Sequence, residues 1–124
     1  MEKIRLVRND TRPQLVISLT DNTTSLPIDL SDAGTVVRLK FKPSGSETVR
    51  ETITAIKLPG KVIEDGTVDY TNMTLGKGGR CYIQWTQTAL SGDAGDYQGE
   101  IEITFPDGVQ TVYDILKFKL RADF

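Results

Sequence analysis

The sequence contains no histidine, and this absence narrows the chemistry open to the protein. Histidine is the side chain most often used as a general base near neutral pH, and it completes Ser-His and Cys-His nucleophile pairs. Paired carboxylates would remain, but the acidic residues lie in polar turns, where solvated carboxylates stay ionised near neutral pH. We therefore predict that the protein is not an enzyme and has no catalytic residues. The acidic residues considered are Glu64, Asp65, Asp69, Asp93 and Asp96.

Cysteine occurs once, as Cys81, so the chain cannot form an internal disulfide. Cys81 alternates with Ile83 and Trp85, which places it on an inward face and predicts a buried, inert thiol. The lack of histidine also excludes most transition-metal sites. Neither "DNTTSLPIDLSD" nor "EDGTVD" has the ligand series of a calcium loop, which leaves only a weak, incidental calcium site open. We predict no cofactor and no metal-binding or cofactor-binding residues.

Long apolar runs are also missing. No window approaches the roughly 18 apolar residues of a membrane span, and the N-terminal "MEKIRLVRND" lacks the apolar stretch of a signal peptide. We expect a cytoplasmically synthesised protein that does not act at a membrane. Fifteen Lys and Arg stand against seventeen Asp and Glu, with the signs interspersed, so no basic face for nucleic acid is expected.

The sequence is rich in β-branched residues, arranged in short alternating runs between Gly, Pro, Asn and Asp. Such runs predict one-sided strands of antiparallel sheets. We expect strands at residues 4–7, 14–20, 35–42, 48–58, 80–85 and from 95 onward, with short ones around Val62 and at 68–70. The expected inward residues are Leu15, Ile17, Leu19, Val37, Leu39, Phe41, Ile53, Cys81, Ile83, Trp85, Tyr97, Ile101, Ile103 and Phe105. At 124 residues the chain fits one all-β domain, an antiparallel β-sandwich over residues 1–124.

The segments between these strands are less regular. Residues 21–34 predict a connection anchored by Leu26, Ile28 and Leu30, and "TQTAL" predicts a helical turn in the crossing at residues 86–94. "PDG" predicts a hairpin whose return strand carries Val109, Thr111 and Tyr113. The apolar alternation then slips, because Ile115 keeps the old phase while Leu116, Phe118 and Leu120 take a new one. Either a bulge or a move of the chain between sheets would produce this slip.

Two segments suggest ligand binding only weakly. "LGKGGR", residues 75–80, is glycine-rich, but it lacks the phosphate-loop spacing and precedes a strand, so we interpret it as a flexible hairpin loop. Tyr82 and Trp85 would stack on sugars if exposed, but the alternation of Trp85 with Cys81 and Ile83 favours the core.

One motif is specific to a fold. The spacing Asp93-x-Gly95-x-Tyr97 at the start of a strand matches the tyrosine corner of immunoglobulin-like sandwiches, in which the hydroxyl binds the backbone upstream. Antibody domains have a cysteine two residues after this tyrosine, whereas this chain has Gly99, as expected without a disulfide. The motif predicts an immunoglobulin-like fold.

A resemblance to a known family is carried by Asp29, Leu30, Gly34, Gly79, Tyr82, Trp85, Gly95, Tyr97, Glu100, Phe105, Asp107, Gly108 and Thr111. The order of these features resembles the N-terminal immunoglobulin-like domain of bacteriophage baseplate upper proteins, through residues 14–120. Two departures stand out: residues 64–77 look inserted, and the chain stops at Phe124, where family members continue into helical or fibre-forming regions that hold receptor-binding proteins. We expect this chain not to hold such proteins through its own C-terminus.

The resemblance implies a non-enzymatic structural protein of a bacteriophage virion, a tail or baseplate adaptor made in the host cytoplasm. Its partners would be other virion proteins, in many copies of a symmetric assembly, with neither nucleic acid nor membrane. A capsid decoration or neck protein and a carbohydrate-binding β-sandwich module stay open as alternatives. We expect contacts at residues 1–13, 44–47 and 64–79. Residues 1–13 allow two interpretations: an arm that adds a strand to a neighbour's open edge, or an edge strand of the chain's own sheet.

Overall fold

The structure of the chain, a computed structural model, describes residues 4–12, 14–21, 23–111 and 116–122. In these ranges all regular secondary structure is β-strand, which confirms the predicted class. The same ranges contain no helix that could cross a membrane. The strands are β1 (Ile4–Val7), β2 (Leu15–Ser18), β3 (Val36–Pro43), β4 (Glu51–Thr54), β5 (Ile56–Lys57), β6 (Lys61–Val62), β7 (Val68–Asp69), β8 (Arg80–Ile83), β9 (Gly95–Phe105), β10 (Gly108–Thr111) and β11 (Leu116–Arg121).

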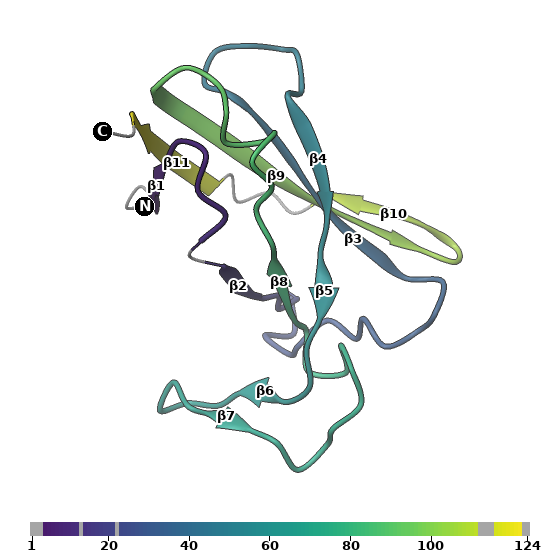
Figure 1. Cartoon of the computed structure of the whole chain (residues 1–124). Coiled ribbons are helices and arrows are strands. Elements are labelled where there is room, and N and C mark those ends of the chain that lie inside the picture. The colour runs from purple at the N-terminus through teal and green to yellow at the C-terminus, as the bar shows by residue number, and fades with distance from the viewer. Residues whose placement is uncertain (1–3, 13, 22, 112–115, 123–124) are drawn as a thin grey trace.

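The strands build the predicted immunoglobulin-like β-sandwich (Figure 1). The larger sheet has the order β1-β11-β9-β3-β4, with β10 also paired to β9, and the smaller sheet has the order β2-β8-β5. The pairings are antiparallel apart from that of β1 with β11, which is parallel. A separate hairpin, β6–β7, lies beyond the ends of β5 and β8 (Figure 1).

Alternation along the strands places one apolar face of each sheet in the shared core, as predicted. Phe41 on β3 lies at the centre of this core and is fully buried. Its ring centroid lies 5.2 Å from that of Trp85, 4.9 Å from that of Tyr97 and 5.4 Å from that of Phe118. These rings come from both sides of the sandwich, so the aromatic cluster joins the two sheets.

Tyr97 forms the predicted corner at the start of β9. Its hydroxyl donates a hydrogen bond of 2.7 Å to the carbonyl of Asp93. Leu90 is fully buried in the crossing before it, and its N–H donates to Thr86 O in a single turn, where the sequence predicted one. The Arg50 guanidinium also binds this crossing, through the carbonyl of Ala89 at 3.1 Å. The corner therefore fixes the passage between the two sheets.

We expect Tyr97→Phe to lower the free energy of unfolding by about 1 kcal/mol, because it removes one hydrogen bond and keeps the buried ring. Chemical denaturation followed by tryptophan fluorescence measures the change. Tyr82→Phe is the matched control, since the Tyr82 hydroxyl has no hydrogen-bond partner in the described ranges. Equal stability of the two variants would count against the corner.

Gly99 stands where antibody domains have a disulfide cysteine, and the structure shows what fills the space. A Cβ atom at Gly99 would lie 2.7 Å from Leu39 Cδ1 and 2.9 Å from Phe118 Cε2. The register places Gly99 opposite Phe41, which packs in the same layer. Apolar side chains therefore occupy the position of a covalent bridge, and glycine is needed there for space.

Residues 48–58 do not form one strand, which corrects the sequence prediction. Ile53 is buried on β4, as expected, but β4 pairs with β3 in the larger sheet, whereas β5 pairs with β8 in the smaller one. Ala55 N–H still donates to Val37 O, and the next residue, Ile56, lies opposite Tyr82. The chain thus changes sheets at Ala55.

The slip in apolar phase near the C-terminus does not come from a move between sheets, because β10 and β11 both pair with β9. Thr111 lies opposite Glu102, and Leu116 lies opposite Gly99, so the register shifts by two residues between β10 and β11. A shift of two residues leaves the phase unchanged, because Gln110 lies opposite the inward Ile103 just as Phe118 lies opposite the inward Tyr97. The slip therefore reflects Val109, which is 64 % exposed on the outer face, and not a one-residue bulge. Tyr113 and Ile115, which the prediction also used, lie outside the described residues.

The structure of the N-terminal segment distinguishes between the two interpretations of residues 1–13, an arm and an edge strand. Ile4–Val7 forms the edge strand β1, paired in parallel with β11. Leu6 is 2 % exposed and belongs to the hydrophobic core, whereas an arm that reaches a neighbouring molecule would not contribute to the core of its own domain. The hypothesis of an arm that reaches a neighbour's edge is therefore replaced by that of an edge strand of the chain's own sheet.

Candidate functional site: an apolar interaction surface

The outer face of the smaller sheet carries a row of apolar side chains, one from each strand. The register places Val16 of β2 opposite Tyr82 of β8, and Tyr82 opposite Ile56 of β5. Val16 is 54 % and Ile56 47 % exposed, and Tyr82 is half-buried. The outward face of a β-sandwich is normally polar, so three neighbouring apolar side chains there are unusual. We call these three residues the apolar row.

A second group of exposed apolar side chains lies in residues 61–75, which we call the projecting segment. It contains the β6–β7 hairpin and the loop after it, and the hairpin extends away from the sandwich (Figure 1). Half of the ten large apolar residues found exposed among the described residues belong to this segment. They are Val62, Ile63, Tyr70, Met73 and Leu75, between 40 % and 62 % exposed.

The projecting segment is attached to the sandwich near the apolar row. The Arg80 guanidinium lies over the Tyr70 ring, 5.9 Å from its centroid, in a cation–π contact. Arg80 also donates a hydrogen bond to the carbonyl of Pro59. Arg80 belongs to β8, as does Tyr82 of the apolar row. One strand therefore links the two apolar groups, and they share one end of the molecule.

Close backbone packing holds the end of this segment, which corrects the interpretation of "LGKGGR" as a flexible hairpin loop. Gly76, Gly78 and Gly79 are buried. Gly79 has φ +77°, and a Cβ atom there would lie 2.4 Å from the carbonyl oxygen of Leu19. Gly76 N–H donates to Leu58 O, and Leu30 N–H donates to Gly76 O. These glycines are required for close approach and a left-handed backbone.

The connection at residues 21–34 meets the projecting segment across a groove of about 570 Å³. Leu30 is buried and Ile28 packs on the core, as predicted, but Leu26, the third expected anchor, is 63 % exposed and lines the groove. Pro27 and Asp29 line the groove with it, and Gly60, β6, β7 and the loop after β7 supply the rest.

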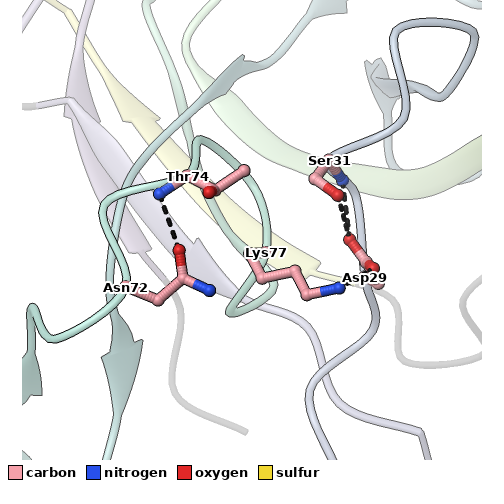
Figure 2. A network of polar contacts seen from close by, with 5 residues as sticks. All are labelled: Asp29, Ser31, Asn72, Thr74 and Lys77. Carbon is pink, nitrogen blue, oxygen red and sulfur yellow. Dashed lines mark hydrogen bonds and ion pairs between the residues drawn. The ribbon is translucent and has the colours of Figure 1, made fainter.

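Polar contacts fix both segments beside the groove (Figure 2). Lys77 Nζ lies 2.8 Å from Asp29 Oδ2, and the hydroxyl of Ser31 donates to Asp29 Oδ1 at 2.6 Å. These hydrogen bonds, that from Lys77 first, lower the pKa of Asp29 to about 2. Asn72 Oδ1 accepts the N–H of Thr74 at 2.9 Å. Asp29 is therefore ionised at neutral pH and paired with a cation.

The structure also places the other side chains that the sequence raised as candidates for chemistry or binding. Cys81 is fully buried, and burial raises the pKa of its thiol to about 11, which agrees with an inert side chain. Trp85 is 1 % exposed, so it belongs to the core. Asp65 and Asp69 each accept hydrogen bonds from the threonine two residues later, which lower their pKa values and oppose acid catalysis. The turn at residues 44–47 is exposed for most of its length.

Among the ranges that the structure describes, no three His, Cys, Asp or Glu side chains come together in a way that could hold a metal ion. The opposite charges on the larger sheet are instead arranged across strands. Lys40 Nζ lies 2.8 Å from Glu102 Oε2, and Lys119 lies opposite Asp96 in the register. The cations of β3 and β11 therefore lie beside the acidic residues of β9, and each strand carries mainly one sign of charge.

The sequence prediction missed the apolar row. The predicted inward residues Leu15, Ile17 and Leu19 leave Val16 at an outward position, and no role was predicted for it. An apolar residue at an outward position was the available signal. It became a surface feature only when the register brought Ile56 and Tyr82 alongside Val16.

A scan of protein-family models finds no match to this sequence, and a search of curated proteins finds none. Among solved structures, the chain is similar to the major subunit AggA of type I aggregative adherence fimbriae from Escherichia coli. The two are 13 % identical, the match covers 98 % of this chain and 91 % of that one, and the TM-score is 0.34. The fold class given above rests on the strand order and registers of this chain.

Proposed function

We propose that this protein is a non-enzymatic structural adaptor that acts through protein–protein contacts in the tail or baseplate of a bacteriophage virion. The observation that supports an adaptor best is the gathering of exposed apolar side chains in the projecting segment, next to the apolar row. Apolar surface that a fold leaves uncovered is typical of a contact site. The assignment to a virion comes from the sequence resemblance alone.

The shape of the projecting segment fits this role. Val62 and Val68 lie opposite each other in the β6–β7 register, and so do Lys61 and Asp69. Successive residues of a strand point to opposite faces, so the hairpin has an apolar face and a polar face. A partner would cover the apolar face, while the packed glycines hold the segment in place. Pre-ordering of this kind lowers the entropic cost of association.

The proposal is tested with the double variant Val62→Lys/Met73→Lys. Both side chains are exposed, at 43 % and 62 %, so the variant should fold normally but should not enter particles. Two charges buried at a contact would be costly, because each would lose its hydration without a partner. The measurement is the amount of variant protein in purified phage particles, by quantitative mass spectrometry, after complementation of a strain lacking the wild-type gene.

The matched control is Val109→Lys, on a valine that is 64 % exposed at the turn end of β10. It should enter particles at the wild-type level. Normal incorporation of the double variant would refute contact through the projecting segment. Absence of the wild-type protein itself from purified particles would refute the virion assignment.

A further inference from the structure

The groove beside the projecting segment is a second surface, distinct from the apolar face of the hairpin. Lys61 and Asp69 both line it, and they pair across the hairpin on the face opposite to Val62 and Val68. Its volume of about 570 Å³ lies within the range typical of small-molecule sites. The proposed adaptor contact leaves this polar face uncovered.

The charges that line the groove balance. Two ammonium groups, of Lys61 and Lys77, stand with two carboxylates, of Asp29 and Asp69. Lys77 is already paired with Asp29 at 2.8 Å (Figure 2). An anionic ligand would have to compete with Asp29 for Lys77, and a cationic ligand would compete with Lys77 for Asp29. Neither kind of charged ligand is favoured, whereas a neutral ligand keeps the pair intact.

A neutral ligand that suits these groups must both donate and accept hydrogen bonds. Carboxylates only accept hydrogen bonds and ammonium groups only donate them, whereas a hydroxyl does both. Asn72, also in the lining, has an amide that supplies a donor and an acceptor, and its oxygen already binds Thr74 N–H. A ligand with several hydroxyl groups therefore satisfies the groove without displacing its internal contacts.

The groove also offers an apolar wall. Leu26 is 63 % exposed, and Pro27 lies next to it in the lining. The position of Leu26 is held by its neighbours, because Asp21 N–H donates to Leu26 O at 2.8 Å and Leu26 N–H donates to Thr24 Oγ1 at 3.3 Å. Sugar rings combine a rim of hydroxyls with apolar C–H faces, which match a wall of this kind.

We propose that the groove between residues 26–29 and the β6–β7 hairpin binds a neutral saccharide, with its hydroxyls on Asp69, Lys61 and Asn72 and its ring on Leu26. The site is separate from the apolar face proposed for protein contact. The proposed protein contact and the proposed saccharide binding are therefore tested by different variants.

The test is a titration of the ¹⁵N-labelled full chain, followed by amide chemical shifts, with maltose, lactose, cellobiose and sucrose as neutral probes. At least one of them should cause saturable shifts at the amides of Lys61, Asp69 and Asn72. Inorganic phosphate and 3′-sialyllactose, as anionic probes at the same concentrations, should bind there more weakly than the best neutral sugar.

The groove variant Leu26→Ser/Lys61→Ala should bind the same sugar roughly tenfold more weakly, as expected for loss of an apolar contact and a charge-assisted hydrogen bond. The matched control, Leu75→Ser/Lys117→Ala, changes a similarly exposed leucine and an exposed lysine outside the groove and should bind normally. No saturable shift with any neutral probe up to about 50 mM would overturn the proposal. Stronger binding of an anionic probe, or unchanged affinity of the groove variant, would overturn it as well.

Discussion

Deletion of residues 1–10 is expected to unfold the protein, because it removes the whole of β1 from the larger sheet. The deletion takes away Leu6, which is 2 % exposed in the core, and exposes the side of β11 that β1 covers. It also removes the hydrogen bond from Arg8 Nε to Gly92 O at 2.7 Å, which ties the first strand to the crossing before Tyr97. Losses at both places exceed what a domain of marginal stability tolerates.

Far-ultraviolet circular dichroism and the dispersion of amide chemical shifts measure this result. A deletion of residues 1–3 is the control, since it leaves β1 complete, and it should keep the folded spectrum. A second variant, Leu6→Ala, separates packing from strand loss and should lower the free energy of unfolding by about 2–5 kcal/mol. A folded protein after deletion of residues 1–10 would contradict the placement of β1 and restore the hypothesis of a free arm.

Phe41→Ala is expected to be the most damaging single core substitution, with a loss of about 3–5 kcal/mol in the free energy of unfolding. The Phe41 ring is fully buried and stacks on Tyr97 at an interplanar angle of 4°. It also meets Trp85 and Phe118 edge to face, so its removal leaves a cavity between the two sheets. Urea denaturation followed by circular dichroism gives the change.

Phe105→Ala is the control for the chemical change at Phe41. Phe105 lies at the end of β9, is only half-buried and packs at the margin of the core. Its substitution should cost clearly less, because less apolar surface is lost and water fills the space. Similar losses for the two variants would mean that the aromatic cluster does not organise the core.

The glycines of residues 76–79 show how fold and candidate site depend on each other. Gly78 lies so close to Gly60 that a Cβ atom on it would overlap the Gly60 carbonyl. This contact closes the base of the projecting segment, which carries five of the exposed apolar side chains and one side of the groove. Both proposed surfaces therefore rest on backbone packing as well as on the side-chain contacts of Arg80 and Lys77.

Alternation of apolar residues was sufficient to predict most of the strands and their inward faces. Val37, Leu39 and Phe41 are buried as their period of two requires, and Tyr97 makes the backbone contact that its spacing from Asp93 indicated. These features could be predicted because they depend on residues that are close in sequence, whose relative positions are set by the backbone geometry of a single strand or turn.

The candidate surfaces could not be predicted in the same way. The sequence marked residues 64–79 as an insertion with a role in contact, but gave no sign that Val16, Ile56 and Tyr82 lie in one row. That row depends on which strands pair and in which register, and the pairing joins segments far apart in the chain. Likewise, Leu26 looked like a core anchor, because only its surroundings in space show that it faces a groove.

By itself the sequence determined the all-β class, the inward faces, the tyrosine corner and the lack of histidine chemistry, since each depends on composition or on spacing within one strand or turn. The tertiary structure alone decided that β1 belongs to the chain's own sheet, that the chain changes sheets at Ala55 and that residues 76–79 are packed rather than free. These outcomes depend on contacts between residues distant in sequence. Many local patterns are compatible with several such pairings, and only the pairing that buries the most apolar surface without steric overlap is adopted.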